Sequence, residues 1–129
     1  MNADISFGIA KELENLDRLS NFFNLSLKKT PGEYNIFDFE CDDTLVELKG
    51  RRCKHDTYPD TMVGYNKIAY ALEHPEKTFI FCFSFQDGLY YHKFNRELDY
   101  TPRTGGRCDR GRPEYKKYTY IPITKLLKI

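Results

Sequence analysis

The chain has 129 residues, which is enough for one domain with its own core and too few for two. It contains no apolar run of the length that a secretion signal or a membrane span requires, so we expect a soluble, intracellular protein with no membrane partner. The net charge of +1 is the sum of an acidic segment and a basic one. Residues 1–50 hold 5 Lys and Arg against 10 Asp and Glu, and residues 51–129 hold 15 Lys and Arg against 9 Asp and Glu.

An amphipathic helix is predicted at residues 6–23, because apolar residues recur there at three- and four-residue spacing. Ser6 is a suitable N-cap for it. Glu12 and Glu14 flank the apolar stripe, as solvated glutamates of a surface helix usually do. A short strand at residues 25–29 is expected to follow, and it ends at the turn signal Thr30-Pro31-Gly32.

The next stretch, YNIFDFECDDTLVELKGRR at residues 34–52, predicts two short strands joined by an acidic turn. Apolar and polar residues alternate over 35–40 and again over 44–49, which is the period of a half-buried strand. Residues 41–44 supply the turn, since Asp readily bonds its own backbone there. The stretch is therefore expected to form a β-hairpin.

The register of this hairpin follows from burial. If Asp38 lies opposite Glu47, then Phe37 faces Leu48, and the apolar residues of the two strands all reach one side of the sheet. Two carboxylates directly opposed across a ladder repel each other. A divalent cation between Asp38 and Glu47 would turn that penalty into a binding site, with Lys49 one step along the strand.

A basic run, Arg51 to His55, leaves the second strand beside the two acids, where it would either contact phosphate or form a solvated loop. Residues 57–73 predict a second helix with Pro59 at its first position and a buried stripe that includes Met62. Lys67 lies off that stripe, where an exposed lysine is the ordinary expectation.

Residues 77–85, KTFIFCFSF, predict a strand buried on both faces, as is usual in the interior of a sheet. The turn signal Asp87-Gly88 then returns the chain into a neighbouring strand at residues 89–94. His92 lies on the aromatic face of that strand, where a satisfied structural histidine is the expectation. The four cysteines lack the paired spacing of a zinc site, so we expect free thiols.

Residues 101–117, TPRTGGRCDRGRPEYKK, predict a long Gly- and Arg-rich loop without a phosphate-loop motif. Arginines spaced by glycine beside tyrosines suit phosphate clamping and base stacking, and a solvated loop is the alternative. A final strand at 118–121 and a helical turn at 124–128 complete the chain. The predicted nucleic-acid contacts are Arg51, Arg52, Lys54, Lys67, Arg103, Arg107, Arg110 and Arg112.

The hairpin also resembles a known family. Asp38, followed nine residues later by Glu47-Leu48-Lys49, is similar to the D…(D/E)-x-K core of the PD-(D/E)XK nuclease superfamily. FDFECDDTLVELKG resembles the corresponding hairpin of phage-type junction-resolving endonucleases and of small phage and giant-virus nucleases. The resemblance covers roughly residues 6–95 in element order, and Phe37 replaces the family's proline. It implies one restriction-endonuclease-like α/β domain over residues 1–129, with a central mixed four- to five-stranded sheet flanked by helices.

The resemblance also implies the roles of individual residues. Asp38, Glu47 and the main-chain carbonyl of Leu48 would bind one or two Mg²⁺ or Mn²⁺ ions, which prefer oxygen ligands. Lys49 would orient the attacking water or stabilise charge on the phosphate. Glu12, in Gly8-x-x-x-Glu12, resembles the family's helical acid, and Glu14 is the rival. A basic residue of the second helix often lies near such a site, which makes Lys67 a further candidate.

The function expected from these features is Mg²⁺-dependent hydrolysis of DNA phosphodiester bonds. Few groups in so small a domain can reach base edges, so cleavage guided by structure, at junctions, branches or ends, is favoured over sequence-specific restriction. Like a Holliday junction resolvase, the protein would act as a homodimer. RNA stays open as a substrate, and a viral origin would place the protein in the host's cytoplasm or nucleus. The alternative is a non-catalytic nucleic-acid-binding or assembly subunit with a degenerate nuclease fold.

Overall fold

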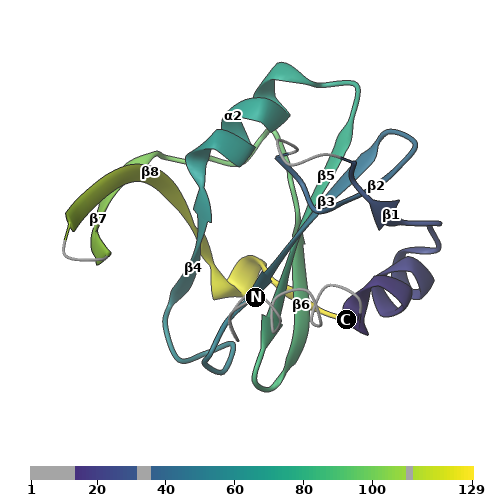
Figure 1. Ribbon diagram of the computed structural model, residues 1–129, viewed down its shortest axis with the longest axis horizontal. Helices are drawn as coiled ribbons and strands as arrows, with labels where there is room; N and C mark the ends of the chain where they lie inside the picture. The colour runs from purple at the N-terminus through teal and green to yellow at the C-terminus, as the bar shows by residue number, and fades with distance from the viewer. Residues whose placement is uncertain (1–13, 32–35, 110–111) are drawn as a thin grey trace.

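The structure, a computed structural model, describes residues 14–31, 36–109 and 112–129 and is built on a six-stranded mixed sheet (Figure 1). Its strands, in spatial order, are β1 (Lys28–Lys29), β2 (Phe39–Cys41), β3 (Thr44–Gly50), β5 (Thr78–Phe85), β6 (Gly88–Lys93) and β9 (Leu127–Lys128). Strands β3 and β5 are parallel, and the other neighbours are antiparallel. The α/β class and the mixed sheet are confirmed, but the sheet has six strands rather than four or five.

A second, three-stranded sheet has the order β4-β8-β7. It consists of β4 (Asp60–Gly64), β8 (Arg112–Pro122) and β7 (Arg103–Asp109), all antiparallel. Helix α2 (Tyr65–Glu73) follows β4 directly, and β4 and α2 together connect the parallel strands β3 and β5. A single 3-10 turn (Ile123–Lys125) leads from β8 to β9.

The main sheet separates two hydrophobic cores. Phe79, Phe81 and Phe83 of β5 pack against α2 and the second sheet through residues such as Ile68 and Ile121. The opposite face of the sheet is covered by the first helix, of which residues 14–23 are described and whose Leu19 is completely buried. The prediction that residues 77–85 form a strand buried on both faces is therefore confirmed. Within the described residues, no helix is long and apolar enough to cross a membrane.

Two predicted elements have other bounds in the structure. The helix predicted from residue 57 begins only at Tyr65, because Asp60–Gly64 forms strand β4, and Pro59 precedes a strand rather than a helix. Burial alternates along β4 with a period of two, and each of its residues pairs with β8. Residues 124–128 were predicted as a helical turn, whereas the turn covers Ile123–Lys125 and Leu127 lies exposed on β9.

The loop predicted at residues 101–117 was also wrong. The chain forms a β-hairpin there, with β7 and β8 in a continuous antiparallel register. Residues Tyr118–Pro122 of β8 also pair with β4, on the edge of β8 that faces away from β7. The hairpin is therefore part of a three-stranded sheet and does not stand alone. Figure 1 shows the pair curving away from the main sheet.

Candidate active site

The predicted β2–β3 register is confirmed around Asp38. Phe39 pairs with Val46, and the Asp38 backbone N–H donates to the Val46 carbonyl at 3.0 Å, which places Asp38 beside Glu47. Asp42, in the turn, has φ of 50°, a conformation that Asp tolerates better than most residues. The Asp38 carboxylate accepts a hydrogen bond from the Leu48 backbone N–H at 2.8 Å, so β3 itself holds this acid in place.

One part of the predicted hairpin was wrong. Phe37 does not join Leu48 but packs in the opposite core, 5.2 Å between ring centroids from Phe79. The reason is that β2 begins only at Phe39, so the alternation of faces stops before Phe37. Thr30 fixes this segment, since its hydroxyl donates to the Phe37 carbonyl at 2.5 Å and its N–H donates to the Asp38 carbonyl at 3.0 Å.

Glu47 is the buried centre of the site, with only 3% of its surface exposed on the central strand β3. Two ammonium groups approach its carboxylate. Lys49 Nζ lies 3.8 Å from Oε1, and Lys67 Nζ lies 2.8 Å from Oε2. Lys67 reaches Glu47 from α2, also donates to the Ile36 carbonyl, and lies over the Phe37 ring. Lys67, expected to be an ordinary exposed lysine, is therefore part of this cluster.

Burial and, next, the neighbouring Asp38, through its charge and a shared hydrogen bond, together raise the pKa of Glu47 to about 7. Lys49 and Lys67 act in the opposite direction but do not cancel the rise in pKa. Oε2 of Glu47 is a buried atom that accepts no hydrogen bond of good geometry from the described residues, although the Lys67 ammonium lies at ion-pair distance. Two carboxylates, one of them incompletely satisfied, are a donor set that suits a hard divalent cation.

The site residues predicted from the hairpin thus lie together: Asp38, Glu47, Leu48 and Lys49 are on adjacent strands. The helical acid is a different matter. Glu12 lies outside the described residues, and its rival Glu14 is exposed on the first helix.

Apart from Lys67, which lies on α2 beside Glu47, the predicted nucleic-acid contacts fall into two groups. Arg51 is turned inward: its Nε donates to the Thr61 hydroxyl at 3.2 Å and its guanidinium to the Met62 carbonyl at 2.5 Å, and burial lowers its pKa. Arg52 and Lys54 are exposed on the loop at residues 51–59.

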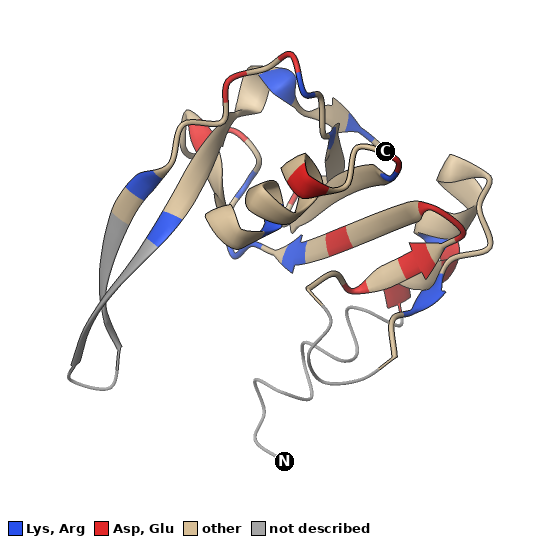
Figure 2. Cartoon of the chain, turned by 90° about the horizontal axis from the view of Figure 1, so that it is seen from above, with Lys and Arg blue, Asp and Glu red and all other residues tan. Residues whose placement is uncertain are grey.

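The remaining predicted contacts belong to the β7–β8 hairpin. Arg103 is exposed at its base, with the guanidinium 5.4 Å from the centre of the Tyr120 ring. Lys and Arg mark the part of the hairpin nearest the body in Figure 2. Arg107 and Arg112 lie on β7 and β8, but their side chains, like Arg110, lie outside what is described.

The prediction from the sequence missed a second group of side chains that could hold a metal ion. His55, Asp56 and Asp87 offer ligand atoms that all lie within 4.8 Å of one another, so they could hold a metal ion. His55 Nδ1 lies 2.6 Å from Asp87 Oδ2, and the His55 backbone N–H donates to Oδ1 at 2.9 Å. Because 32 residues separate His55 from Asp87, no local spacing could have joined them.

His92 is the structural residue that the sequence predicted. One ring nitrogen lies 2.8 Å from the Tyr100 hydroxyl and the other 3.2 Å from the Lys125 carbonyl. Since the carbonyl can only accept, Nδ1 carries the proton and Nε2 accepts from Tyr100. Burial lowers the pKa of His92, consistent with a neutral ring. Cys41, Cys53 and Cys82 are free thiols, also as predicted.

A mixed sheet that carries an acid pair and a lysine on adjacent strands is the arrangement expected of the PD-(D/E)XK nuclease class. Residues 6–129 match the family model described as "Phage putative PDDEXK endonuclease", and the chain belongs to that family. The predicted membership is confirmed, over more of the chain than the hairpin-based resemblance covered. No curated protein and no solved structure matches the chain. An endonuclease family implies DNA as the substrate.

Proposed function

We propose that the protein is a single-domain DNA endonuclease that depends on Mg²⁺ or Mn²⁺ and uses Asp38, Glu47 and Lys49. The observation that carries the proposal is Glu47, a buried acid that stands beside a second carboxylate and within 4 Å of two lysine ammonium groups. A buried charge cluster of this kind is costly to maintain for stability alone, and perturbed acids of this kind concentrate at functional sites.

The cation would be held by Asp38, Glu47 and the Leu48 carbonyl, with Glu12, which lies outside the described residues, as a further acid. When bound, it would polarise the scissile phosphate and favour a water nucleophile near neutral pH. Glu47 must give up its proton before it can serve as a ligand, and Asp38 is held ready by the Leu48 N–H.

The two lysines have different environments and therefore different roles. Lys49 is 44% exposed at the side chain, so its ammonium can reach a phosphate and stabilise the charge that builds on it. Lys67 is only 16% exposed and is turned to Glu47, so it balances the charge of that acid and fixes its orientation. Lys49 is thus proposed as the catalytic lysine and Lys67 as a positioning residue.

Binding would rest on phosphate contacts from Arg52, Lys54, Arg103 and the β7–β8 hairpin, which would make it salt-sensitive. Arg51 would act indirectly, by tying the end of β3 to β4. Recognition would be guided by DNA structure, at junctions, branches or ends, and a homodimer would allow both strands of a junction to be cut.

The proposal is tested by a cleavage panel in Mg²⁺, in Mn²⁺ and with chelator, on a four-way junction, a flap, a nicked duplex, a linear duplex, single-stranded DNA and RNA. We expect cleavage only with metal, and a loss on the order of 10²–10³-fold in Lys49→Ala. Lys93→Ala, an exposed lysine on β6, is the matched control and should cleave normally.

One observation favours a second candidate function. The Lys67 ammonium already lies 2.8 Å from Glu47, and a lysine can balance the charge of an acid without a metal. Metal-independent binding of these nucleic acids, with no cleavage of any of them, would support a non-catalytic binding subunit instead.

A further inference from the structure

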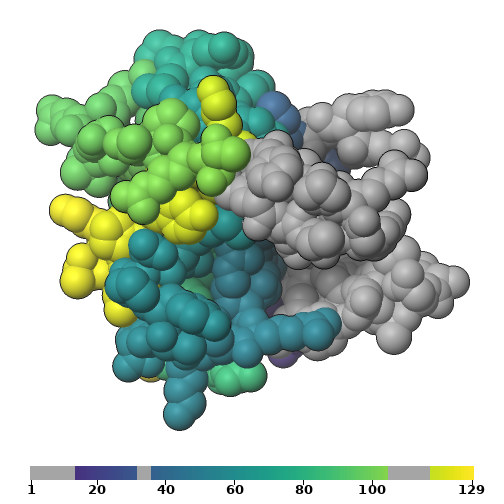
Figure 3. Space-filling view, turned by 90° about the vertical axis from the view of Figure 1, so that its left-hand side faces the viewer, coloured from purple at the N-terminus to yellow at the C-terminus, as the bar shows by residue number. Residues whose placement is uncertain are grey.

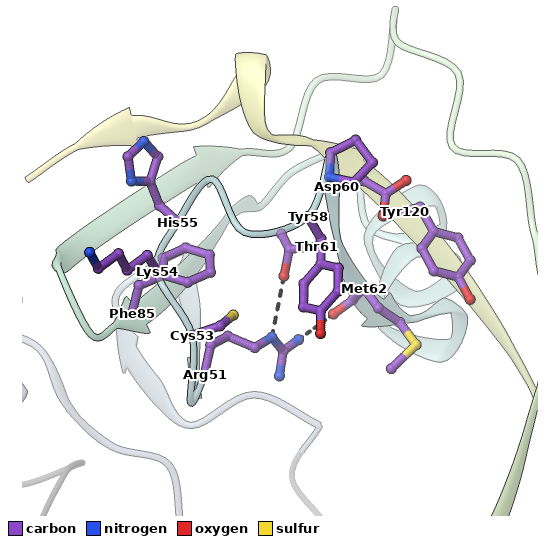
Figure 4. Close-up of a pocket in the computed structure, with 11 residues that line it drawn as sticks. Arg51, Cys53, Lys54, His55, Tyr58, Asp60, Thr61, Met62, Phe85 and Tyr120 are labelled. Carbon is purple, nitrogen blue, oxygen red and sulfur yellow. Dashed lines mark hydrogen bonds between the residues drawn. The ribbon is translucent and has the colours of Figure 1, made fainter.

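A pocket of about 410 Å³ opens between the loop at residues 51–59, strand β4 and β8 (Figure 4). Its lining is mostly apolar and includes three aromatic rings, those of Tyr58, Phe85 and Tyr120. Lys54 and His55 also line it. The volume is within the range of ligand sites. In the space-filling view the same loop, in dark teal, forms part of the surface beside the yellow C-terminal residues (Figure 3).

Two of the three rings are accessible for stacking: Tyr58 is exposed and Tyr120 is half-buried, whereas Phe85 belongs to the hydrophobic core. Tyr58 is 64% exposed, so its ring is open to a ligand. Tyr120 lies to the right of Tyr58 in Figure 4, and the Arg103 guanidinium lies over the Tyr120 ring. Exposed aromatic rings bordered by cations are the elements with which proteins bind unstacked bases of nucleic acids.

The pocket is also held in shape by hydrogen bonds from its surroundings. The loop is tied to the β5–β6 turn by the His55–Asp87 pair and by Gln86, whose N–H donates to the Cys53 carbonyl at 2.9 Å. Behind Tyr58, the Ile123 N–H donates to the Pro59 carbonyl at 3.0 Å. A site shaped before its ligand arrives loses less entropy on binding.

Arg51 connects this pocket to the proposed active site. Arg51 lines the pocket and follows Glu47 by four residues. The chain between them stays paired with β5, since the Arg51 N–H donates to the Ser84 carbonyl at 2.9 Å. Four extended residues span about 13 Å. That is roughly the length of four stacked nucleotides of one strand, and fewer if they are unstacked.

We propose that this pocket binds an unpaired nucleobase of the DNA strand whose phosphate lies at Glu47 and Lys49. The inference rests on the proposed function and deepens it: the substrate class is DNA with at least one unstacked nucleotide close to the cut. A fully paired duplex keeps its bases inside the helix and would leave the pocket unused. The bordering Lys54 and Arg103 complement the phosphates on either side of that nucleotide.

Binding assays in chelator test the proposal independently of catalysis. The probes are a duplex with a single bulged 2-aminopurine, the matched fully paired duplex, and the bulged strand as RNA. Wild type should bind the bulged DNA more tightly than the paired DNA and quench its fluorescence by stacking. Tyr58→Ala should weaken binding of the bulged probe roughly 5- to 100-fold and change the paired probe by less than about twofold.

Two further variants make the result specific. Tyr58→Phe keeps the ring and should bind within about twofold of wild type. Phe22→Ala removes another exposed aromatic, 45% exposed, from the helix on the opposite face of the main sheet, and should change neither probe. The proposed base-binding role of the pocket would be overturned if Tyr58→Ala weakened binding of both probes equally, or if wild type showed no preference for the bulged probe. Selective binding without cleavage in metal would overturn the proposed endonuclease and leave the pocket intact.

Discussion

Two groups of acids among the described residues, Asp38 with Glu47 and Asp56 with Asp87, differ in burial. Glu47 lies inside the protein, and its pKa is raised to about 7 by burial and by Asp38. Asp87 lies at the surface, and its pKa is lowered by hydrogen bonds from His55. The same kind of side chain therefore prefers to be protonated in one place and ionised in the other.

The difference supports the proposal that Asp38 and Glu47, rather than the surface group, hold the cation. Asp87 already has a hydrogen-bonding partner at each carboxylate oxygen, so little is gained by adding a metal. Glu47 is destabilised as a carboxylate even with two lysines near it, and a divalent ion would relieve that cost. Burial together with a second acid thus favours Asp38 and Glu47 over the group of three ligands at the surface.

The largest expected effect is loss of cleavage in Glu47→Gln. Gln has the same shape but carries no charge, so it removes a metal ligand without opening a cavity. We expect cleavage to fall on the order of 10³-fold or more, in proportion to the loss of metal binding, with the folded circular dichroism spectrum retained. Cleavage at wild-type level in this variant would remove Glu47 from the site.

The sequence could reveal the acid pair because all of its determinants are local. Asp38 and Glu47 are joined by a short turn, and the alternation of apolar side chains allows only one register. The same reasoning misplaced Phe37, because β2 begins only after this residue and no local feature of the sequence marks where the strand begins.

Lys67 and the β7–β8 hairpin could not be found in this way, because distant parts of the chain determine them. Lys67 meets Glu47 only because β4 and α2 carry it back over the sheet, and its spacing within the helix is that of a surface lysine. The Gly- and Arg-rich composition of residues 101–117 is typical of loops. These residues nevertheless form the paired strands β7 and β8, because the adjoining part of β8 pairs with β4. Local propensity was outweighed by tertiary context.

The next effect concerns stability and its dependence on pH. Because the pKa of Glu47 rises from 4.5 to about 7 on folding, its contribution to stability is complete below pH 4.5 and is lost as the pH rises through about 7. The loss is roughly 3 kcal/mol relative to Glu47→Gln, which does not titrate. Urea unfolding of both proteins between pH 4.5 and 8 measures the difference, and a constant difference would contradict the raised pKa.

A smaller effect is expected when the positioning lysine is removed. Lys67 lowers the pKa of Glu47, so Lys67→Met should raise that pKa and move the midpoint of pH-dependent Mn²⁺ binding to higher pH. Calorimetric titration across this range would measure the shift. Lys93→Met serves as the control, and a shift of the same size there would show a general charge effect rather than a contact with Glu47.

The smallest effect belongs to the surface cluster. Asp87→Asn keeps an oxygen that can accept the His55 N–H, so the loop stays tied to the β5–β6 turn, while the charge that a metal would need is lost. We expect cleavage of a linear duplex within about twofold of wild type and a fall in Tm of less than about 5 °C, as is usual for an exposed pair. The contribution of Asp87 to stability has the opposite pH dependence to that of Glu47, because the pKa of Asp87 is lowered on folding. This contribution is present when the pH is above the pKa of Asp87 in the unfolded chain, and it is lost in acid. If cleavage in Asp87→Asn instead fell as far as in Glu47→Gln, and excess Mn²⁺ restored it, the catalytic ion would belong at the surface cluster, and the buried acid would be a structural partner of Lys67.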